Sequence, residues 1–135
     1  MKALILDVMG VLVSPNSLLG HKEFLQICDD VKSKGGFIIL YSNCTSRIVE
    51  HDPLYEFNQK YVDNGYFNDN GQPIKPSQES FHAILSLHYL KPDECMYIDD
   101  TPHNIEIASI LGFKTILFSE PVSVIEQLKK LIAEN

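Results

Sequence analysis

The chain has 135 residues, of which 44% are hydrophobic and 21% charged, a composition typical of a globular protein and not of a disordered, collagen-like or disulfide-stapled one. Its 11 basic residues against 18 acidic ones give a net charge of −7, which disfavours nucleic acid as a partner because phosphate backbones bind basic surfaces. The 3 cysteines are scattered and no apolar run approaches the ~20 residues of a membrane span, so we expect a mature cytoplasmic protein with no membrane partner. The length predicts a single domain, residues 1–135.

Short apolar runs recur along the chain, and each is followed by polar residues. None of the runs alternates apolar with polar residues, which predicts strands covered on both faces, as in a parallel sheet. The runs and the residues that follow them are 3–6 before Asp7, 37–41 before Ser42 and Asn43, 95–98 before Asp99 and Asp100, and 115–118 before Ser119 and Glu120.

Apolar residues at helical spacing occupy the segments between these runs. They predict helices over 24–31, 81–90 and 103–111, a last helix that begins near Pro121, a further helix within 52–64 and a short edge strand at 66–67. Alternation of strands and helices predicts an α/β fold, a three-layer sandwich around a parallel sheet of four or five strands.

Acidic and hydroxyl side chains follow three of the predicted strands. Ligands of such sheets bind beyond the C-terminal ends of the strands, so Asp7, Ser42 and the pair Asp99 and Asp100 are expected to converge there. Buried carboxylates are costly unless a cation or hydrogen-bond donors meet them. Mg²⁺ is the cation that suits carboxylate oxygens together with a substrate phosphate. The alternative, that each Asp caps a helix or turn, is weakened by having three acids at strand ends.

Four segments carry motifs in a fixed order: DVMGVL at 7–12, LYSN at 40–43, Lys75 with Pro76, and YIDDTPHN at 97–104. Together they resemble the motifs of the haloacid dehalogenase (HAD) superfamily of hydrolases. The resemblance covers residues 3–118, nearly the whole chain, and its order and fourth motif make it specific. It implies a HAD-like Rossmannoid parallel sheet.

The resemblance also implies roles for the residues of the first three motifs. Asp7 would be the nucleophile that forms an aspartyl phosphate, which is covalent catalysis by a carboxylate. Ser42, Asn43 and Lys75 would bind the phosphoryl group, with Lys75 neutralising charge in the site. The expected substrate is therefore a phosphorylated small molecule or phosphoprotein.

The resemblance further implies a magnesium site. Asp7 and Asp100 would be direct Mg²⁺ ligands, and the backbone carbonyl of Met9 a third. Asp99 and Asn104 would be auxiliary ligands or lie behind the direct ones. Metal, lysine and hydroxyl would then all stabilise charge on the phosphoryl oxygens.

Met9 departs from the phosphatase pattern, in which the residue two after the nucleophile is a second Asp that protonates the leaving group and then activates water. A thioether does neither, and general acid–base catalysis contributes ~10²- to 10⁴-fold. Superfamily dehalogenases, phosphonate hydrolases and ion-pumping ATPases also lack that Asp, although a dehalogenase would have little need of the acidic pair. The residues favour a slow Mg²⁺-dependent phosphatase; the alternative is a catalytically impaired binding or regulatory module.

Two histidines are candidates to replace the missing acid. His103 lies within the fourth motif and His21 just beyond the first loop, and an imidazole titrates near pH ~6.5. A solvent-facing role is the commoner one for a loop histidine, and it is our preferred interpretation of His103.

The spacing of the motifs leaves no room for a cap domain. Asp7 and Ser42 are 35 positions apart, and Ser42 and Lys75 are 33 apart. We therefore expect an open site, which suits a large substrate or a small one enclosed by a second copy in a homo-oligomer.

Overall fold

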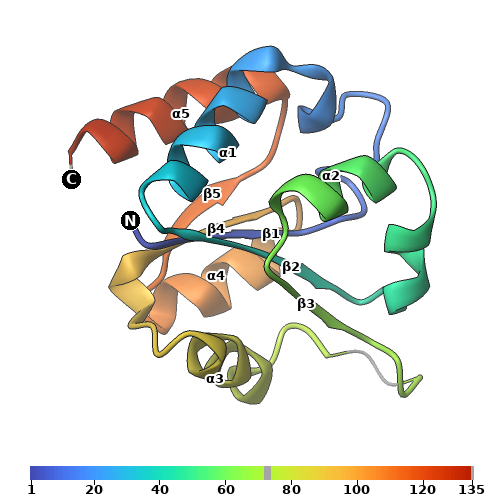
Figure 1. Cartoon of the computed structure of the whole chain (residues 1–135). Helices are drawn as coiled ribbons and strands as arrows, with labels where there is room; N and C mark the ends of the chain where they lie inside the picture. The colour runs from blue at the N-terminus through green and yellow to red at the C-terminus, as the bar shows by residue number, and fades with distance from the viewer. Residues whose placement is uncertain (72–73, 135) are drawn as a thin grey trace.

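Five parallel strands form one sheet in the computed structural model, which describes residues 1–71 and 74–134 (Figure 1). The order across the sheet is β3-β2-β1-β4-β5, with β1 at its centre. The predicted parallel sheet is confirmed, and the expected edge strand at 66–67 is the end of β3. The strands are β1 (Ala3–Leu6), β2 (Phe37–Ser42), β3 (Asn64–Phe67), β4 (Cys95–Asp99) and β5 (Lys114–Leu117).

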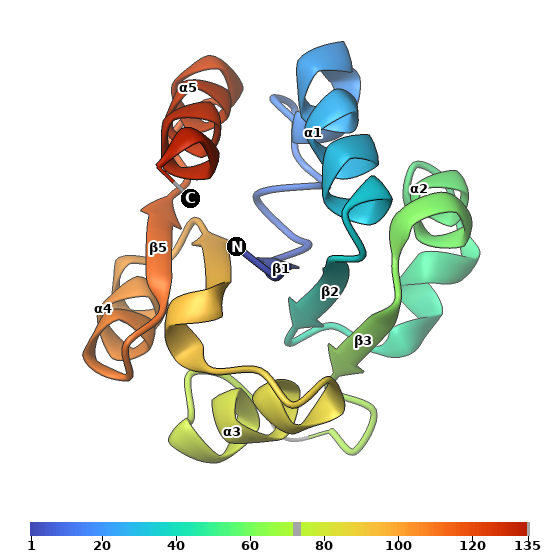
Figure 2. The same ribbon diagram turned by 60° about the vertical axis from the view of Figure 1, so that its left-hand side comes forward.

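Helices cover both faces of the sheet, which gives the three predicted layers (Figure 2). One face carries α1 (Lys22–Ser33), α2 (Leu54–Tyr61) and α5 (Pro121–Ala133). The other carries α3 (Gln78–Leu87) and α4 (Pro102–Ile110). Short 3₁₀ turns lie at Leu18–Gly20, Ser46–Glu50 and Pro92–Glu94.

Each central strand contributes to two cores because successive side chains point to opposite faces. Leu4 and Leu6 of β1 pack beneath α1, α2 and α5, whereas Ala3 and Ile5 pack against α3 and α4. All four residues of β1 are fully buried, and each large apolar side chain buried in this way contributes roughly 1.5–3 kcal/mol. Burial on both faces is the physical reason that the apolar runs of the sequence do not alternate.

No cap domain is inserted over the sheet in the part of the chain that the structure describes. The interval between β1 and β2 holds α1, and the interval between β2 and α3 holds α2 and β3. None of the described helices combines the length and apolar character needed to cross a membrane.

Candidate functional site

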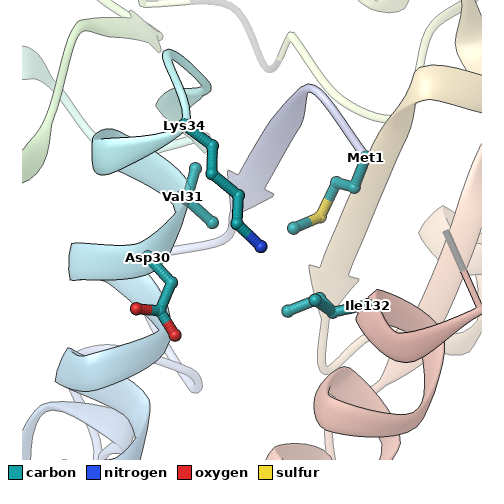
Figure 3. Close-up of a pocket in the computed structure, with 5 residues that line it drawn as sticks. All are labelled: Met1, Asp30, Val31, Lys34 and Ile132. Atoms are coloured by element: carbon teal, nitrogen blue, oxygen red, sulfur yellow. The ribbon is translucent and has the colours of Figure 1, made fainter.

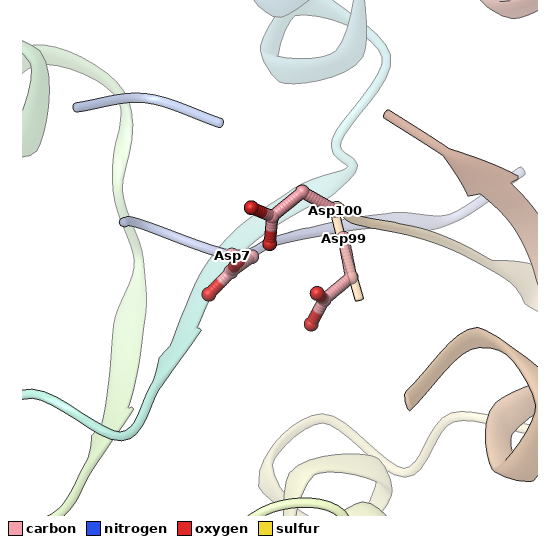
Figure 4. Close-up of side chains that lie close together, drawn as sticks. All are labelled: Asp7, Asp99 and Asp100. Atoms are coloured by element: carbon pink, nitrogen blue, oxygen red, sulfur yellow. The ribbon is translucent and has the colours of Figure 1, made fainter. Parts of the chain in front are cut away.

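Strand register brings the acidic residues together at the C-terminal edge of the sheet. Leu6 at the end of β1 pairs with Leu40 of β2 and Ile98 of β4. Asp7 therefore follows β1 at the level of Asp99, and its backbone N–H donates to the carbonyl of Ile98 at 3.0 Å. Oxygen atoms of Asp7, Asp99 and Asp100 all lie within 4.8 Å of one another (Figure 4). The predicted convergence of the three acids is thus present in the structure.

Lys75 enters this cluster from the segment before α3. Its Nζ donates to Asp7 Oδ1 at 2.5 Å, to Asp99 Oδ2 at 2.9 Å and to the backbone carbonyl of Tyr41 at 3.0 Å. Nζ also lies 5.0 Å from the centroid of the Tyr41 ring, a cation–π arrangement. The ammonium group is thus buried but fully engaged, and it bridges two carboxylates from adjacent strands.

Asp99 is fully buried, and both of its carboxylate oxygens accept hydrogen bonds from protein donors. Oδ2 accepts from Lys75, from the hydroxyl of Tyr97 and from Asn104 Nδ2 at 3.2 Å, while Oδ1 accepts from the Thr101 N–H at 2.9 Å. These donors stabilise the charged form of the carboxylate. Asp99 is therefore part of the hydrogen-bond network that supports the site.

The two buried carboxylates differ in acidity. Burial raises the pKa of Asp7 to about 7, and the nearby Asp99 and Asp100 add to this rise against the opposing charge of Lys75. Burial also opposes ionisation of Asp99, but Lys75 and the hydrogen bonds from Tyr97 and Thr101 outweigh it and lower its pKa. Without a metal, the negative charge of Asp7 is therefore less well stabilised than that of Asp99.

Asn43 fixes the backbone that carries Lys75. Its Oδ1 accepts from the N–H groups of Ile74 at 2.8 Å and Lys75 at 3.0 Å, and its Nδ2 donates to the Lys75 carbonyl at 3.0 Å. Both ends of the side-chain amide are thereby engaged. Asn43 follows β2 at the same edge of the sheet, and its contacts are those of a residue that positions Lys75.

Ser42, the last residue of β2, is buried at the same edge of the sheet. Its Oγ accepts a hydrogen bond from the N–H of Cys44 at 3.0 Å. Because a hydroxyl can accept and donate at once, Ser42 keeps a proton available for a ligand. Cys44 is a free thiol, as are Cys28 and Cys95.

Gly10 explains how the exposed Asp100 reaches the first loop. Gly10 has a φ of +89°, a conformation that glycine adopts at no steric cost. A Cβ at this position would collide with the carboxylate of Asp100. The close approach of loop and carboxylate thus depends on the absence of a side chain.

The residues of this edge fit Mg²⁺. Three carboxylates from two strand ends lie within reach of one ion, and Asp100 is exposed, which leaves a path for the ion and its waters. Lys75 supplies one positive charge against these three acids, so a divalent cation would balance the remaining charge. Asn104, by contrast, is buried and donates to Asp99, which puts it behind that carboxylate.

Comparisons with known proteins agree with this architecture. No family model matches the chain. A predicted HAD-like family hydrolase from Porphyromonas gingivalis superposes with a TM-score of 0.73 at 16% identity, covering 100% of this chain and 99% of that one. A HAD family enzyme from Bacteroides thetaiotaomicron, solved in complex with magnesium and inorganic phosphate, gives 0.61 at 15% identity over 88% and 94% of the two chains. The chain has the haloacid dehalogenase fold.

The similarity in sequence is shorter than the similarity in structure. Enolase-phosphatase E1 from Lachancea thermotolerans is 33% identical over 57 residues, which are 42% of this chain and 26% of that protein. The chain therefore spans about a quarter of that relative. The HAD-like fold predicted from the motifs and its three layers are confirmed, with no cap domain among the described residues.

Met9, the residue that departs from the phosphatase pattern, lies in the loop after β1. Met9 follows Asp7 by two residues in the first loop, and its residue surface is 49% exposed. Its backbone forms an isolated bridge with Val13. His103 is exposed on the first turn of α4, and His21 is half-buried where α1 begins.

Two tyrosines of this candidate site were missed by sequence reasoning. Tyr97 donates its hydroxyl to Asp99, and Tyr41 gives its carbonyl and ring face to Lys75. Tyr97 stands two residues before Asp99 on β4, so the two side chains share a face of the sheet. That spacing was a usable signal for the first pair. The role of a backbone carbonyl, as at Tyr41, leaves no trace in the sequence.

Proposed function

We propose that the chain is a Mg²⁺-dependent phosphoric monoester hydrolase that acts through an aspartyl phosphate on Asp7. The observation that carries this proposal is the buried Asp7 carboxylate at the end of the central strand, held by Lys75 and lying beside Asp100. Within this proposal residues 1–135 form a single hydrolase domain, although 72, 73 and 135 lie outside the described residues.

The phosphoryl group of the substrate is proposed to lie against the Asp7 carboxylate, just beyond the C-terminal edge of the sheet. The Ser42 hydroxyl would donate to one phosphoryl oxygen, and the Lys75 ammonium would donate to another by giving up one of its three present acceptors. Asn43 contributes to binding by keeping the Lys75 backbone in place. Preorganised donors of this kind stabilise charge without reorganising during the reaction.

Mg²⁺ would be held by Asp7, Asp100 and the carbonyl of Met9, with Asp99 and Asn104 behind them. When bound, the ion supplies charge neutralisation to the phosphoryl oxygens and favours the ionised form of Asp7. Ionised Asp7 is the nucleophile, and Lys75 at 2.5 Å keeps it oriented toward the bound phosphoryl group.

Met9 makes the proposed enzyme slow, because its thioether can neither protonate a leaving oxygen nor deprotonate water. The missing acid–base contribution is ~10²- to 10⁴-fold. The substrate is a phosphorylated small molecule or a phosphoprotein, since no cap limits access to the site among the described residues. The HAD family enzyme solved with magnesium and inorganic phosphate supports the choice of metal and of substrate group.

Phosphate release from a panel of phosphomonoesters, measured with Mg²⁺ and with a chelator, tests the proposal. We expect release that needs Mg²⁺ and that disappears in Asp7→Asn purified in parallel. Release that persists in Asp7→Asn would come from another residue or a contaminant. If folded protein releases no phosphate from any ester of the panel, the alternative of a binding module is favoured. Met9 is the residue that supports this alternative.

A further inference from the structure

We propose that the leaving group of the substrate is an apolar, acidic alcohol, above all an aryl group, and that it binds in a groove beside Met9. This inference rests on the proposed phosphatase function and specifies its substrate class. It would make aryl phosphates the substrates of this site and alkyl phosphates poor ones.

The groove lies along the first loop and has a volume of about 670 Å³. This is within the range of sites that take small organic molecules. Its walls are mostly apolar, from Met9, Leu12, Val13, Leu19 and Pro53. Met9 is the member that links the groove to the nucleophile, since it follows Asp7 by two residues and is half exposed.

A second hollow, of about 390 Å³, joins the groove to the acidic cluster. Ser14 and Pro15 line both, and Gly10 and Asp100 line the second hollow. The Asp100 carboxylate belongs to the three-acid cluster. A ligand whose phosphoryl group lies at the acids could therefore extend through this second hollow to the apolar groove.

The groove offers no acidic side chain that could protonate the leaving oxygen. Among the described residues that line it, the polar side chains are the hydroxyls of Ser14 and Ser17, and that of Ser17 donates to the Leu12 carbonyl at 2.5 Å. Neither hydroxyl is an acid near neutral pH. A leaving oxygen must then depart as an anion, which only an acidic alcohol does readily.

The bonds and protons of the proposed reaction balance without a general acid. A carboxylate oxygen of Asp7 attacks phosphorus, the bond from phosphorus to the leaving oxygen breaks, and the electron pair departs on an aryloxide that takes a proton from solvent water. The oxygen of a water molecule then attacks phosphorus, and the bond from phosphorus to the Asp7 oxygen breaks, which restores the Asp7 carboxylate. One proton of that water stays on the released phosphate, and the other passes to solvent. Apolar contacts along the groove hold the aryl ring through the first step.

The other end of the sheet gives a contrasting hollow. It lies between α1 and α5, has a volume of about 180 Å³, and carries the charged side chains of Asp30 and Lys34 beside Met1 (Figure 3). It stands at the N-terminal edge of β1, away from the three acids. The apolar groove at Met9, in contrast, is joined to the acidic cluster by the hollow at Asp100.

The test is a leaving-group series assayed for phosphate release: 4-nitrophenyl, phenyl, 2-naphthyl and butyl phosphate. We expect kcat/KM for 4-nitrophenyl phosphate to exceed that for butyl phosphate by at least ~10²-fold, the scale of the missing acid. Equal rates for the two would overturn the inference while leaving the phosphatase function intact. No release from any of the four would contradict the function itself.

Two matched variants test the groove separately. We expect KM for 2-naphthyl phosphate to lie about tenfold below that for phenyl phosphate, and Leu19→Ser to erase this difference. Leu87→Ser is the control, because Leu87 is 41% exposed at the end of α3, on the other face of the sheet. Equal KM values for the two aryl esters in the wild type, or the same response in both variants, would overturn the groove assignment.

Discussion

The two sides of the site are built in different ways. On the side proposed to bind the phosphoryl group, Asp7, Lys75 and Asp99 form a buried network joined by hydrogen bonds. On the side proposed to bind the leaving group, Met9 and Leu19 line an open apolar groove. One side is a rigid set of charges, and the other is a surface without an ionisable group among its described lining residues.

The difference separates two tasks that an acid–base residue normally links. In the proposed reaction, binding and attacking a phosphoryl group needs the charged network, which is expensive to bury. Moving protons to the leaving group and from water needs a titratable side chain at the position of Met9. We infer that the chain keeps the first task and leaves the second to the chemistry of its substrate.

The largest effect is expected from removing the nucleophile on the phosphoryl side. Asp7→Asn should lower turnover by at least ~10⁴-fold, because no covalent intermediate can form. Steady-state kinetics in the presence of Mg²⁺ measures the loss. A smaller loss would mean that the network binds substrate without providing the attacking group.

Breaking the same network at its cation should unfold the protein more easily. Lys75→Met leaves Asp7 and Asp99 without their shared partner, a change that costs about 3–5 kcal/mol for a buried pair. Urea unfolding of the metal-free protein gives the free energy of unfolding. Lys2→Met is the control, since Lys2 pairs with Glu94 at the surface and its side chain is 67% exposed. Equal losses in the two variants would contradict the central place of Lys75.

The fold was largely predictable from the sequence, because β1, β2 and β4 are continuous apolar runs that end in polar residues. The three-acid cluster followed from that pattern alone. The contacts of Asn43 did not follow, since they depend on where the segment at 74–75 lies against the edge of the sheet. The contact of Tyr97 with Asp99 was signalled by their spacing on one strand and was overlooked. Long-range placement of a loop is set by packing, which no local pattern encodes.

Asp7 also predicts how stability depends on pH without metal. Its pKa is about 7 in the folded protein against 3.8 in the unfolded chain, so folding holds its proton more tightly. The protonated Asp7 carboxyl therefore adds at most about 4 kcal/mol to the free energy of unfolding. This gain is fully present below about pH 4 and is lost as the pH rises to 7. Unfolding at a series of pH values should show this decline in the wild type and not in Asp7→Asn. An unchanged slope in the variant would assign the decline to another group.

Restoring an acid on the leaving-group side should remove the contrast between the two sides. Met9→Asp should raise kcat/KM for butyl phosphate by on the order of 10²-fold and change the value for 4-nitrophenyl phosphate much less. Met9→Asn is the matched control of similar size without the proton. A gain of equal size in both variants would point to shape and not to proton transfer.

The smallest effect is expected from removing the hydrogen bond that Tyr97 donates to Asp99. Tyr97→Phe removes one hydrogen bond to Asp99, which keeps its contacts to Lys75, Asn104 and the Thr101 N–H. A loss of about 1–2 kcal/mol in the free energy of unfolding is expected. Thermal unfolding measures it, and a loss as large as that of Lys75→Met would mean that Tyr97 organises the network.

The most direct test is a rapid-mixing experiment with 4-nitrophenyl phosphate and Mg²⁺. If Met9 cannot activate water, the aspartyl phosphate on Asp7 should form faster than it is hydrolysed. We predict a burst of nitrophenolate close to one equivalent per protein chain, and a phosphorylated Asp7 by mass spectrometry of the quenched protein. A linear time course with no phosphorylated Asp7, at a turnover that Asp7→Asn retains, would contradict the account.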